Sequence, residues 1–219
     1  MRFRPRRRSV RARRDDAPHA RDWDENEIFP VESMRKAASA RLRRYLREGR
    51  CRRLRAQSRL DAALIFEELA QGCTSTAAYI SIHNMAAWMI DAFGGARQRS
   101  RNFCPSSAPC EHFASYCLTE PDSGSDAASL STRGRRDGEH YVLDGAKAFI
   151  SGGGVSDVYV VHGPHRGAGP HGISCIAVEK GTPGLSFGAQ EKKLGWKSQP
   201  TAMVDLRELP RAGCEPDRQ

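Results

Sequence analysis

The sequence predicts an α+β protein in which an N-terminal helical domain, residues 23–112, is followed by an antiparallel β-barrel domain, residues 113–206. Two observations carry this prediction. Apolar residues recur at helical spacing over residues 60–94, whereas after residue 113 the period shortens to that of strands. Gly, Pro, Asp and Ser separate these short apolar runs, a pattern typical of an antiparallel barrel or sandwich.

The helical part of the sequence is clearest on either side of Gly72. Residues 60–71 place their leucines and isoleucine on one face, and Gly72 is a C-cap signal. The hydroxyls of residues 74–76 can cap the next helix, residues 77–93, which is apolar on most sides. Such a helix is predicted to be buried among others, and His83 within it is interpreted as a core or substrate-side residue.

Positive charge is concentrated in the first quarter of the chain. Residues 1–59 hold 20 Lys or Arg and 8 Asp or Glu, a net charge of +12, whereas the remainder has a net charge of −3. Residues 1–22 carry eight Arg before the first acidic residue and show no hydrophobic periodicity. They predict a basic disordered tail or a mitochondrial transit-like segment, with a nucleic-acid-binding arm as the third alternative.

Composition argues against several classes of protein. The seven cysteines are irregularly spaced without a CxxC pair, which favours reduced thiols and disfavours a zinc site. No apolar run reaches the roughly 18 residues that span a bilayer. Neither a Walker motif nor a GxGxxG occurs, so a Rossmann fold has no support. His162, His165 and His171 lie in a Gly/Pro loop, and no metal site is predicted from them.

Residues 116–126, YCLTEPDSGSD, form the most informative stretch. A predicted strand ends here, and the loop that follows offers hydroxyls and backbone N–H groups, while Gly124 allows close approach to a ligand. Such a loop suits a flavin ring or a pyrophosphate, although on composition alone an ordinary turn is the simpler interpretation. Glu120 is interpreted as structural, and Cys117 as a small buried apolar residue.

A second stretch, residues 149–154 with the sequence FISGGG, ends another predicted strand. It combines an aromatic residue, a hydroxyl and three glycines. Without a following GKS or GxxG, the glycines are weak support for phosphate binding. Asp137-Gly138 and Asp144-Gly145 are predicted turns around the intervening strand.

Together, YCLTEPDSGSD and GAKAFISGGG, about 20 residues apart, resemble the flavin signature of the acyl-CoA dehydrogenase family. The resemblance covers residues 23–38, 60–95 and 113–206, and it is strongest to the branch that acts on isobutyryl-CoA. It implies a helical N-terminal domain followed by a β-barrel middle domain.

The resemblance further implies that both stretches bind FAD. Phe149 would pack on the flavin, the Ser151 hydroxyl would bond to it, and Thr119 would lie at its ring. Gly124 and Ser125 would lie near the phosphates, and Ser125 also near the acyl-CoA substrate. The implied set is Tyr116, Cys117, Leu118, Thr119, Gly124, Ser125, Phe149, Ile150 and Ser151.

The family's reaction is implied in the same way. A carboxylate removes the α proton of a short branched acyl-CoA, the β hydrogen leaves as hydride to FAD, and electrons pass to electron transfer flavoprotein. The resemblance also implies a homotetramer in the mitochondrial matrix and a role in valine catabolism. The base belongs to a C-terminal four-helix domain that this sequence is expected to lack, so no catalytic residue is assigned.

Three segments depart from the family pattern: residues 39–59, 96–112 and 207–219. Out-of-frame reading of GC-rich codons tends to yield the Arg, Ala, Pro and Ser found there. We therefore interpret these segments as frame-shifted or mis-spliced, with residues 207–219 as an aberrant tail. Two alternatives to an active dehydrogenase stay open: a catalytically inactive truncated fragment, and a nucleic-acid binder that uses the basic arm.

Overall fold

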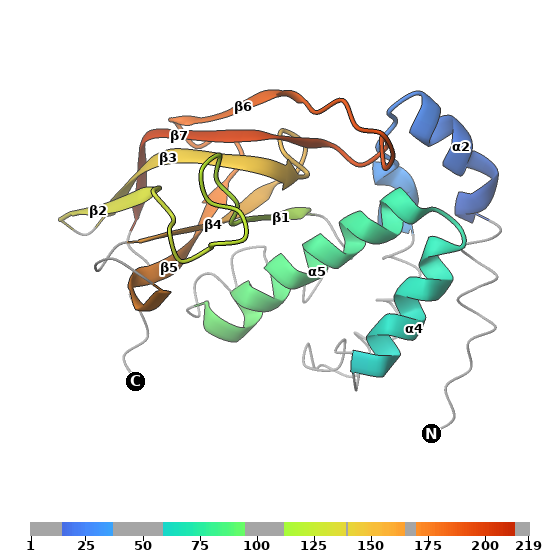
Figure 1. Cartoon of the computed structure of the whole chain (residues 1–219), viewed down its shortest axis with the longest axis horizontal. Helices are drawn as coiled ribbons and strands as arrows, with labels where there is room; N and C mark the ends of the chain where they lie inside the picture. Colours follow the sequence, from blue (N-terminus) through green and yellow to red (C-terminus); the bar gives the residue numbers. More distant parts are fainter. Residues whose placement is uncertain (1–14, 37–58, 95–111, 139, 165–169, 213–219) are drawn as a thin grey trace. The chain divides into compact units, whose positions relative to one another are not determined.

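The computed structural model describes residues 15–36, 59–94, 112–138, 140–164 and 170–212 (Figure 1). Helices precede strands in this part of the chain, which confirms the predicted α+β class. The chain divides into two compact units. The first holds the described residues up to Ser81 together with Lys192–Gln199, and the second holds Ile82–Gly94 and the other described residues from His112 onward. None of the described helices is long and apolar enough to cross a membrane.

Helix α2 (Ala17–Glu25), the first with given bounds among the described residues, begins inside the predicted disordered tail. The helix contradicts the disordered alternative for residues 1–22 from Ala17 onward, and the transit-like alternative stays a prediction. Contacts one turn apart favour the helix: the His19 ring stacks on Trp23 with centroids 5.5 Å apart, and Arg21 Nε lies 2.8 Å from Glu25 Oε1. Each pair joins residues four apart, a spacing that Arg-rich composition does not reveal.

The segment Lys192–Gln199 belongs to the first unit, although its flanking strands belong to the second. Asp24 of α2 holds it there, because one carboxylate oxygen accepts hydrogen bonds from the backbone N–H of Lys197 (2.7 Å) and the hydroxyl of Ser75 (3.1 Å). A single acidic side chain thus joins segments 173 residues apart in sequence.

Helix α4 (Arg59–Ala70) ends just before Gly72, as predicted, and α5 (Thr74–Phe93) follows. The cap of α5 differs from the prediction. Cys73 Sγ accepts hydrogen bonds from the backbone N–H and the hydroxyl of Thr76, at 3.5 and 3.2 Å. A thiol therefore lies where a hydroxyl of residues 74–76 was expected to cap the helix.

Two sheets make up the β part of the second unit (Figure 1). One has the order β1-β4-β5, and the other has the order β2-β3-β7-β6. The strands are β1 (Ala114–Cys117), β2 (Arg133–Asp137), β3 (His140–Ser151), β4 (Val158–Pro164), β5 (Ile173–Glu179), β6 (Leu185–Gln190) and β7 (Thr201–Ala212). All pairs are antiparallel except β1 with β4. That pair can be parallel because β2 and β3 form the long crossover between them.

Apolar side chains from both sheets form one continuous core. Alternate residues of each strand point into it, which is the period expected for strands with one buried face. Its buried members are Cys117, Leu143, Ile150, Tyr159, Val161, Ile176, Val178, Val204, Leu206 and Leu209. This core holds the ends of β1 and β3, from which both candidate flavin-binding stretches emerge.

The two predicted Asp-Gly turns have different outcomes. Asp137-Gly138 begins the tight connection of the β2–β3 hairpin, with Gly138 at φ +61°, which confirms that prediction. Asp144-Gly145 lies within β3, so the turn predicted there is wrong. A Cβ on Gly145 would lie 2.6 Å from Thr132 Oγ1 and 2.7 Å from Thr132 Cα, so the glycine permits close approach of two chain segments.

The segment predicted as an aberrant tail, residues 207–219, begins within β7. Residues 207–212 continue β7, where Leu209 pairs with Leu143 and is completely buried. The strand extends this far because Leu209 is buried in the core against residues distant in sequence. Residues 213–219 lie outside the described residues, as do residues 1–14 and nearly all of the Arg-rich segment 39–59 and of segment 96–112.

Candidate functional site

The two stretches singled out from the sequence lie side by side where β1 and β3 end. The backbone N–H of Ala148 donates to the carbonyl of Thr119 at 2.8 Å. The hydroxyl of Ser115 donates to the carbonyl of Ser151 at 2.6 Å. These two bonds join residues 115–119, at the start of the first stretch, to residues 148–151, at the start of the second.

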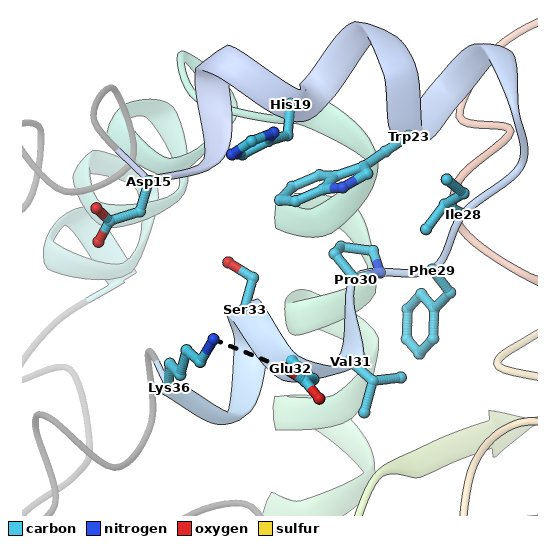
Figure 2. Close-up of a pocket in the computed structure, with 10 residues that line it drawn as sticks. All are labelled: Asp15, His19, Trp23, Ile28, Phe29, Pro30, Val31, Glu32, Ser33 and Lys36. Atoms are coloured by element: carbon cyan, nitrogen blue, oxygen red, sulfur yellow. Dashed lines mark ion pairs between the residues drawn. The ribbon is translucent and has the colours of Figure 1, made fainter.

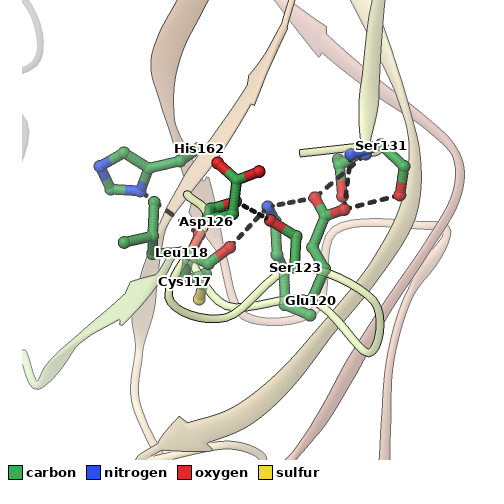
Figure 3. A network of polar contacts seen from close by, with 9 residues as sticks. Cys117, Leu118, Glu120, Ser123, Asp126, Ser131 and His162 are labelled. Carbon is green, nitrogen blue, oxygen red and sulfur yellow. Dashed lines mark hydrogen bonds and ion pairs between the residues drawn. The ribbon is translucent and has the colours of Figure 1, made fainter. Parts of the chain in front are cut away.

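A buried ion pair strengthens this junction. Lys147 Nζ lies 2.7 Å from Glu120 Oε1, and their side chains are 0% and 1% exposed. The same ammonium donates to the carbonyl of Leu118 at 3.0 Å. Figure 3 shows the Glu120 carboxylate beside Ser131, from whose N–H and hydroxyl it accepts hydrogen bonds. It also accepts from the N–H of Thr132. The structural interpretation of Glu120 agrees with this arrangement.

The environment keeps Glu120 ionised. Burial alone would raise its pKa, but hydrogen bonds from Lys147, Ser131 and Thr132 outweigh that effect and lower the pKa to about 2. For Lys147 burial acts in the opposite direction and lowers the pKa, because it disfavours the charged ammonium. The adjacent Glu120 carboxylate opposes this shift. A carboxylate so held cannot exchange protons with a ligand near neutral pH.

Phe149 is presented outward by a strained backbone. Its φ is +56°, a left-handed conformation that is uncommon for a residue other than glycine. The β3–β7 register shifts between Lys147 and Ile150, and the Phe149 side chain is 65% exposed. The following residue, Ile150, returns to the core. The bulge therefore offers an aromatic ring next to the Thr119 loop.

The other predicted site residues differ in the solvent exposure of their side chains. Cys117 and Ile150 point into the core, so only their backbone atoms can meet a ligand. The interpretation of Cys117 as buried is confirmed, and burial raises the pKa of its thiol. Tyr116 is half-buried with its ring 4.5 Å from that of His162. The remaining members are half-buried Leu118, Thr119 and Ser151, and exposed Gly124 and Ser125.

The three glycines after Ser151 form a packed turn. The Tyr159 hydroxyl donates to the carbonyl of Gly152 at 3.2 Å and accepts from the N–H of Gly154 at 3.1 Å. Gln190 Nε2 donates to the carbonyl of Gly153 at 2.9 Å, and a Cβ there would lie 3.0 Å from that of Ala202. Close packing therefore explains Gly153, and positive φ values of +82° and +80° explain Gly152 and Gly154.

Sequence reasoning missed Lys147, Tyr159 and Gln190 as supports of the site. A signal existed for Lys147, because it lies four residues after Leu143 and strand alternation places both on the inner face. An inward-facing lysine requires a buried partner, and Glu120 is that partner. No comparable pattern marks Tyr159 or Gln190.

Two histidines near this region are held in the neutral form. His83 Nδ1 accepts from the N–H of Ala114 at 3.0 Å, and burial lowers the pKa of His83 to about 4. His162 lies within 3.3 Å of the carbonyl of Cys117, and burial lowers its pKa to about 4 as well. The described residues contain no group of three or more His, Cys, Asp or Glu that could hold a metal ion.

We expect the low pKa of His83 to appear in the pH dependence of stability. The neutral form is favoured in the folded state, so its contribution is complete above pH 6.5 and is lost as the pH falls through about 4. A shift of this size corresponds to at most roughly 3 kcal/mol. Urea unfolding at several pH values should show a shallower decline for His83→Asn than for the unaltered chain. Equal declines would contradict the assignment.

A separate open cavity of about 560 Å³ lies in the first unit (Figure 2). The rings of His19 and Trp23 face it, and the Lys36–Glu32 ion pair, at 3.6 Å, lies on its rim. None of the predicted FAD or substrate residues lines this cavity. Its mixed lining of exposed polar groups and apolar rings does not define a ligand.

Comparisons with known proteins agree on one family. The model described as "Acyl-CoA dehydrogenase, N-terminal domain" matches residues 6–107, and the model described as "Acyl-CoA dehydrogenase, middle domain" matches residues 115–209. Mitochondrial isobutyryl-CoA dehydrogenase from Bos taurus is 58% identical over 193 residues, which cover 88% of this chain and 46% of that protein. The Dictyostelium discoideum protein of the same name is 55% identical over 187 residues, covering 84% and 44%.

A solved structure gives the same result for the fold. Butyryl-CoA dehydrogenase from Megasphaera elsdenii superimposes with a TM-score of 0.82 at 25% sequence identity. The match covers 96% of this chain and 58% of that protein. The chain spans about half the length of the curated relatives it matches.

Proposed function

The chain belongs to the acyl-CoA dehydrogenase family, and on this basis we propose that the two adjacent loops bind the isoalloxazine ring of FAD. The observation that carries the proposal is their juxtaposition through the hydrogen bond between Ala148 and Thr119. It supports a single binding face made of Leu118–Thr119 and Phe149–Ser151. FAD, when bound, would supply the hydride acceptor for the oxidation.

The residues on this face suit a flavin. Phe149 offers an exposed aromatic ring for stacking, and the half-buried hydroxyls of Thr119 and Ser151 offer hydrogen bonds. Nothing lies within 4 Å of the position of a Cβ on Gly124, so its backbone is open to a ligand's phosphates. The neighbouring Ser125 is exposed and is proposed to contact the acyl-CoA.

The proposed substrate is a short branched acyl-CoA such as isobutyryl-CoA. It is supported by 58% and 55% identity to relatives named for that activity. A mitochondrial matrix location, a homotetramer and electron transfer flavoprotein as acceptor are proposed on the same basis. Glu120 is not the proton-accepting base, since it is buried, ion-paired and of low pKa.

We expect Phe149→Ala to raise the dissociation constant of FAD about tenfold, because a lost aromatic stack is worth about 1 kcal/mol or slightly more. Quenching of FAD fluorescence on titration with the purified chain measures this. Phe93→Ala is the matched control, since Phe93 is 71% exposed at the end of α5 and is not part of the site. Equal effects of the two substitutions would contradict the proposed face.

The substrate proposal has its own test. The FAD-loaded chain would be incubated with isobutyryl-CoA and an artificial electron acceptor, and product formation measured. Turnover supports an active dehydrogenase. FAD binding without turnover favours the alternative of a catalytically inactive fragment.

A further inference from the structure

The ion pair of Lys147 and Glu120 occupies the point where the two proposed flavin loops meet. Lys147 immediately precedes Ala148, whose N–H bonds to Thr119, and its ammonium bonds to the carbonyl of Leu118. The carboxylate of Glu120 accepts the same ammonium. Three consecutive residues of the first loop are therefore tied to two consecutive residues of the second.

The same carboxylate also closes the first loop on itself. It accepts two hydrogen bonds from Ser131 and one from Thr132, which lie 11 and 12 residues farther along the chain. Both ends of the loop that contains Gly124 and Ser125 are thus fixed to one buried side chain. Loss of the pair would remove the ammonium that ties the start of this loop to β3.

Stability alone does not account for such a pair. Removing two charges from water costs several kcal/mol per ion, and apolar residues of similar volume are often as stabilising as a buried ion pair. The pair has a more specific geometric consequence. The register shift that presents Phe149 begins at Lys147, so an anchored Lys147 fixes where the strained Phe149 backbone starts.

We propose that Lys147 and Glu120 are positioning residues that set the spacing of Thr119 and Phe149 around the flavin ring. This inference rests on the proposed function. Both side chains are completely buried, so they act through the two loops. Neither is a member of the set of residues assigned to FAD from the sequence.

The test is the double variant Lys147→Met/Glu120→Gln, which removes both charges and leaves a carbonyl oxygen to accept from Ser131 or Thr132. We expect a cooperatively folded protein whose FAD dissociation constant is raised about tenfold or more. The visible absorption bands of its bound flavin should be shifted relative to those of the unaltered chain. A purely stabilising pair would leave the spectrum of bound flavin unchanged.

A matched control is the exposed pair of the first unit. Lys36→Met/Glu32→Gln removes the same two charges at side chains that are 75% and 86% exposed. We expect its FAD affinity and flavin spectrum to equal those of the unaltered chain. If Lys147→Met/Glu120→Gln left both the FAD affinity and the spectrum of the bound flavin unchanged, the proposal would be overturned.

Hydrogen exchange of the Ala148 amide, without FAD, separates this inference from the proposed function. The N–H of Ala148 bonds to Thr119, so its exchange should be at least about tenfold faster in the double variant and unchanged in the control. If the unaltered chain binds no FAD, the proposed function fails. The exchange rate of the Ala148 amide then decides by itself whether the pair positions the two loops. If the double variant does not fold, Glu120→Asp replaces it, because it keeps both charges and withdraws the carboxylate by one methylene. An unchanged Ala148 rate in that variant overturns the inference.

Discussion

Replacement of Lys147 by methionine alone is expected to lower the free energy of unfolding by about 3–5 kcal/mol, the cost of leaving one partner of a buried pair uncompensated. The remaining Glu120 carboxylate would keep its bonds to Ser131 and Thr132 while losing the only cation described within reach. Urea-induced unfolding at neutral pH measures the change. Lys36→Met, which removes an exposed ammonium, is the control and should be nearly neutral.

The pH dependence gives this prediction a second readout. In the unaltered chain the pKa of Glu120 falls from 4.5 to about 2, so its contribution is complete above pH 4.5 and is lost as the pH falls through about 2. In Lys147→Met the carboxylate lacks its cation, so it should take up a proton at higher pH. A loss below about 1 kcal/mol at neutral pH would show that the pair is not buried as described.

Leu209→Ala is expected to lower the free energy of unfolding by about 2–5 kcal/mol, the usual cost of deleting a buried leucine side chain. Leu209 is completely buried and pairs with Leu143 across β7 and β3. It also lies in the segment that was predicted from the sequence to be an aberrant tail, so the substitution tests whether that segment belongs to the core.

The control for Leu209→Ala is Leu194→Ala, because Leu194 is fully exposed. We expect the control to change the free energy of unfolding by no more than about 0.5 kcal/mol. Urea unfolding of both variants under one condition gives the comparison. Similar small effects at the two positions would place residues 207–212 outside the folded core and restore the interpretation of an aberrant tail.

The sequence anticipated those features of the fold that depend on neighbouring residues. The Asp137-Gly138 turn is local, since two adjacent residues suffice to close the hairpin. The Asp144-Gly145 pair carries the same letters, but Gly145 is required by the approach of Thr132, which lies just before β2. Likewise, β7 extends through Leu209 because of a pairing with β3, which no local pattern in that segment encodes.

The candidate site shows the same division. Both loops were predicted as strand ends followed by Ser, Gly and aromatic residues, and their residues were assigned to FAD by resemblance to a family. Their hydrogen-bonded contact, and the outward turn of Phe149 at positive φ, emerge only from the pairing of β3 with β7. Strand alternation alone could have predicted an inward Lys147, but not that its partner would be Glu120.

Backbone amide chemical shifts recorded during an FAD titration of the isotopically labelled chain test the central claim most directly. If Leu118–Thr119 and Phe149–Ser151 form one flavin face, signals from both segments should move together and give a single dissociation constant. Signals that move in only one segment, or in two segments with different dissociation constants, would show that the loops do not share a flavin.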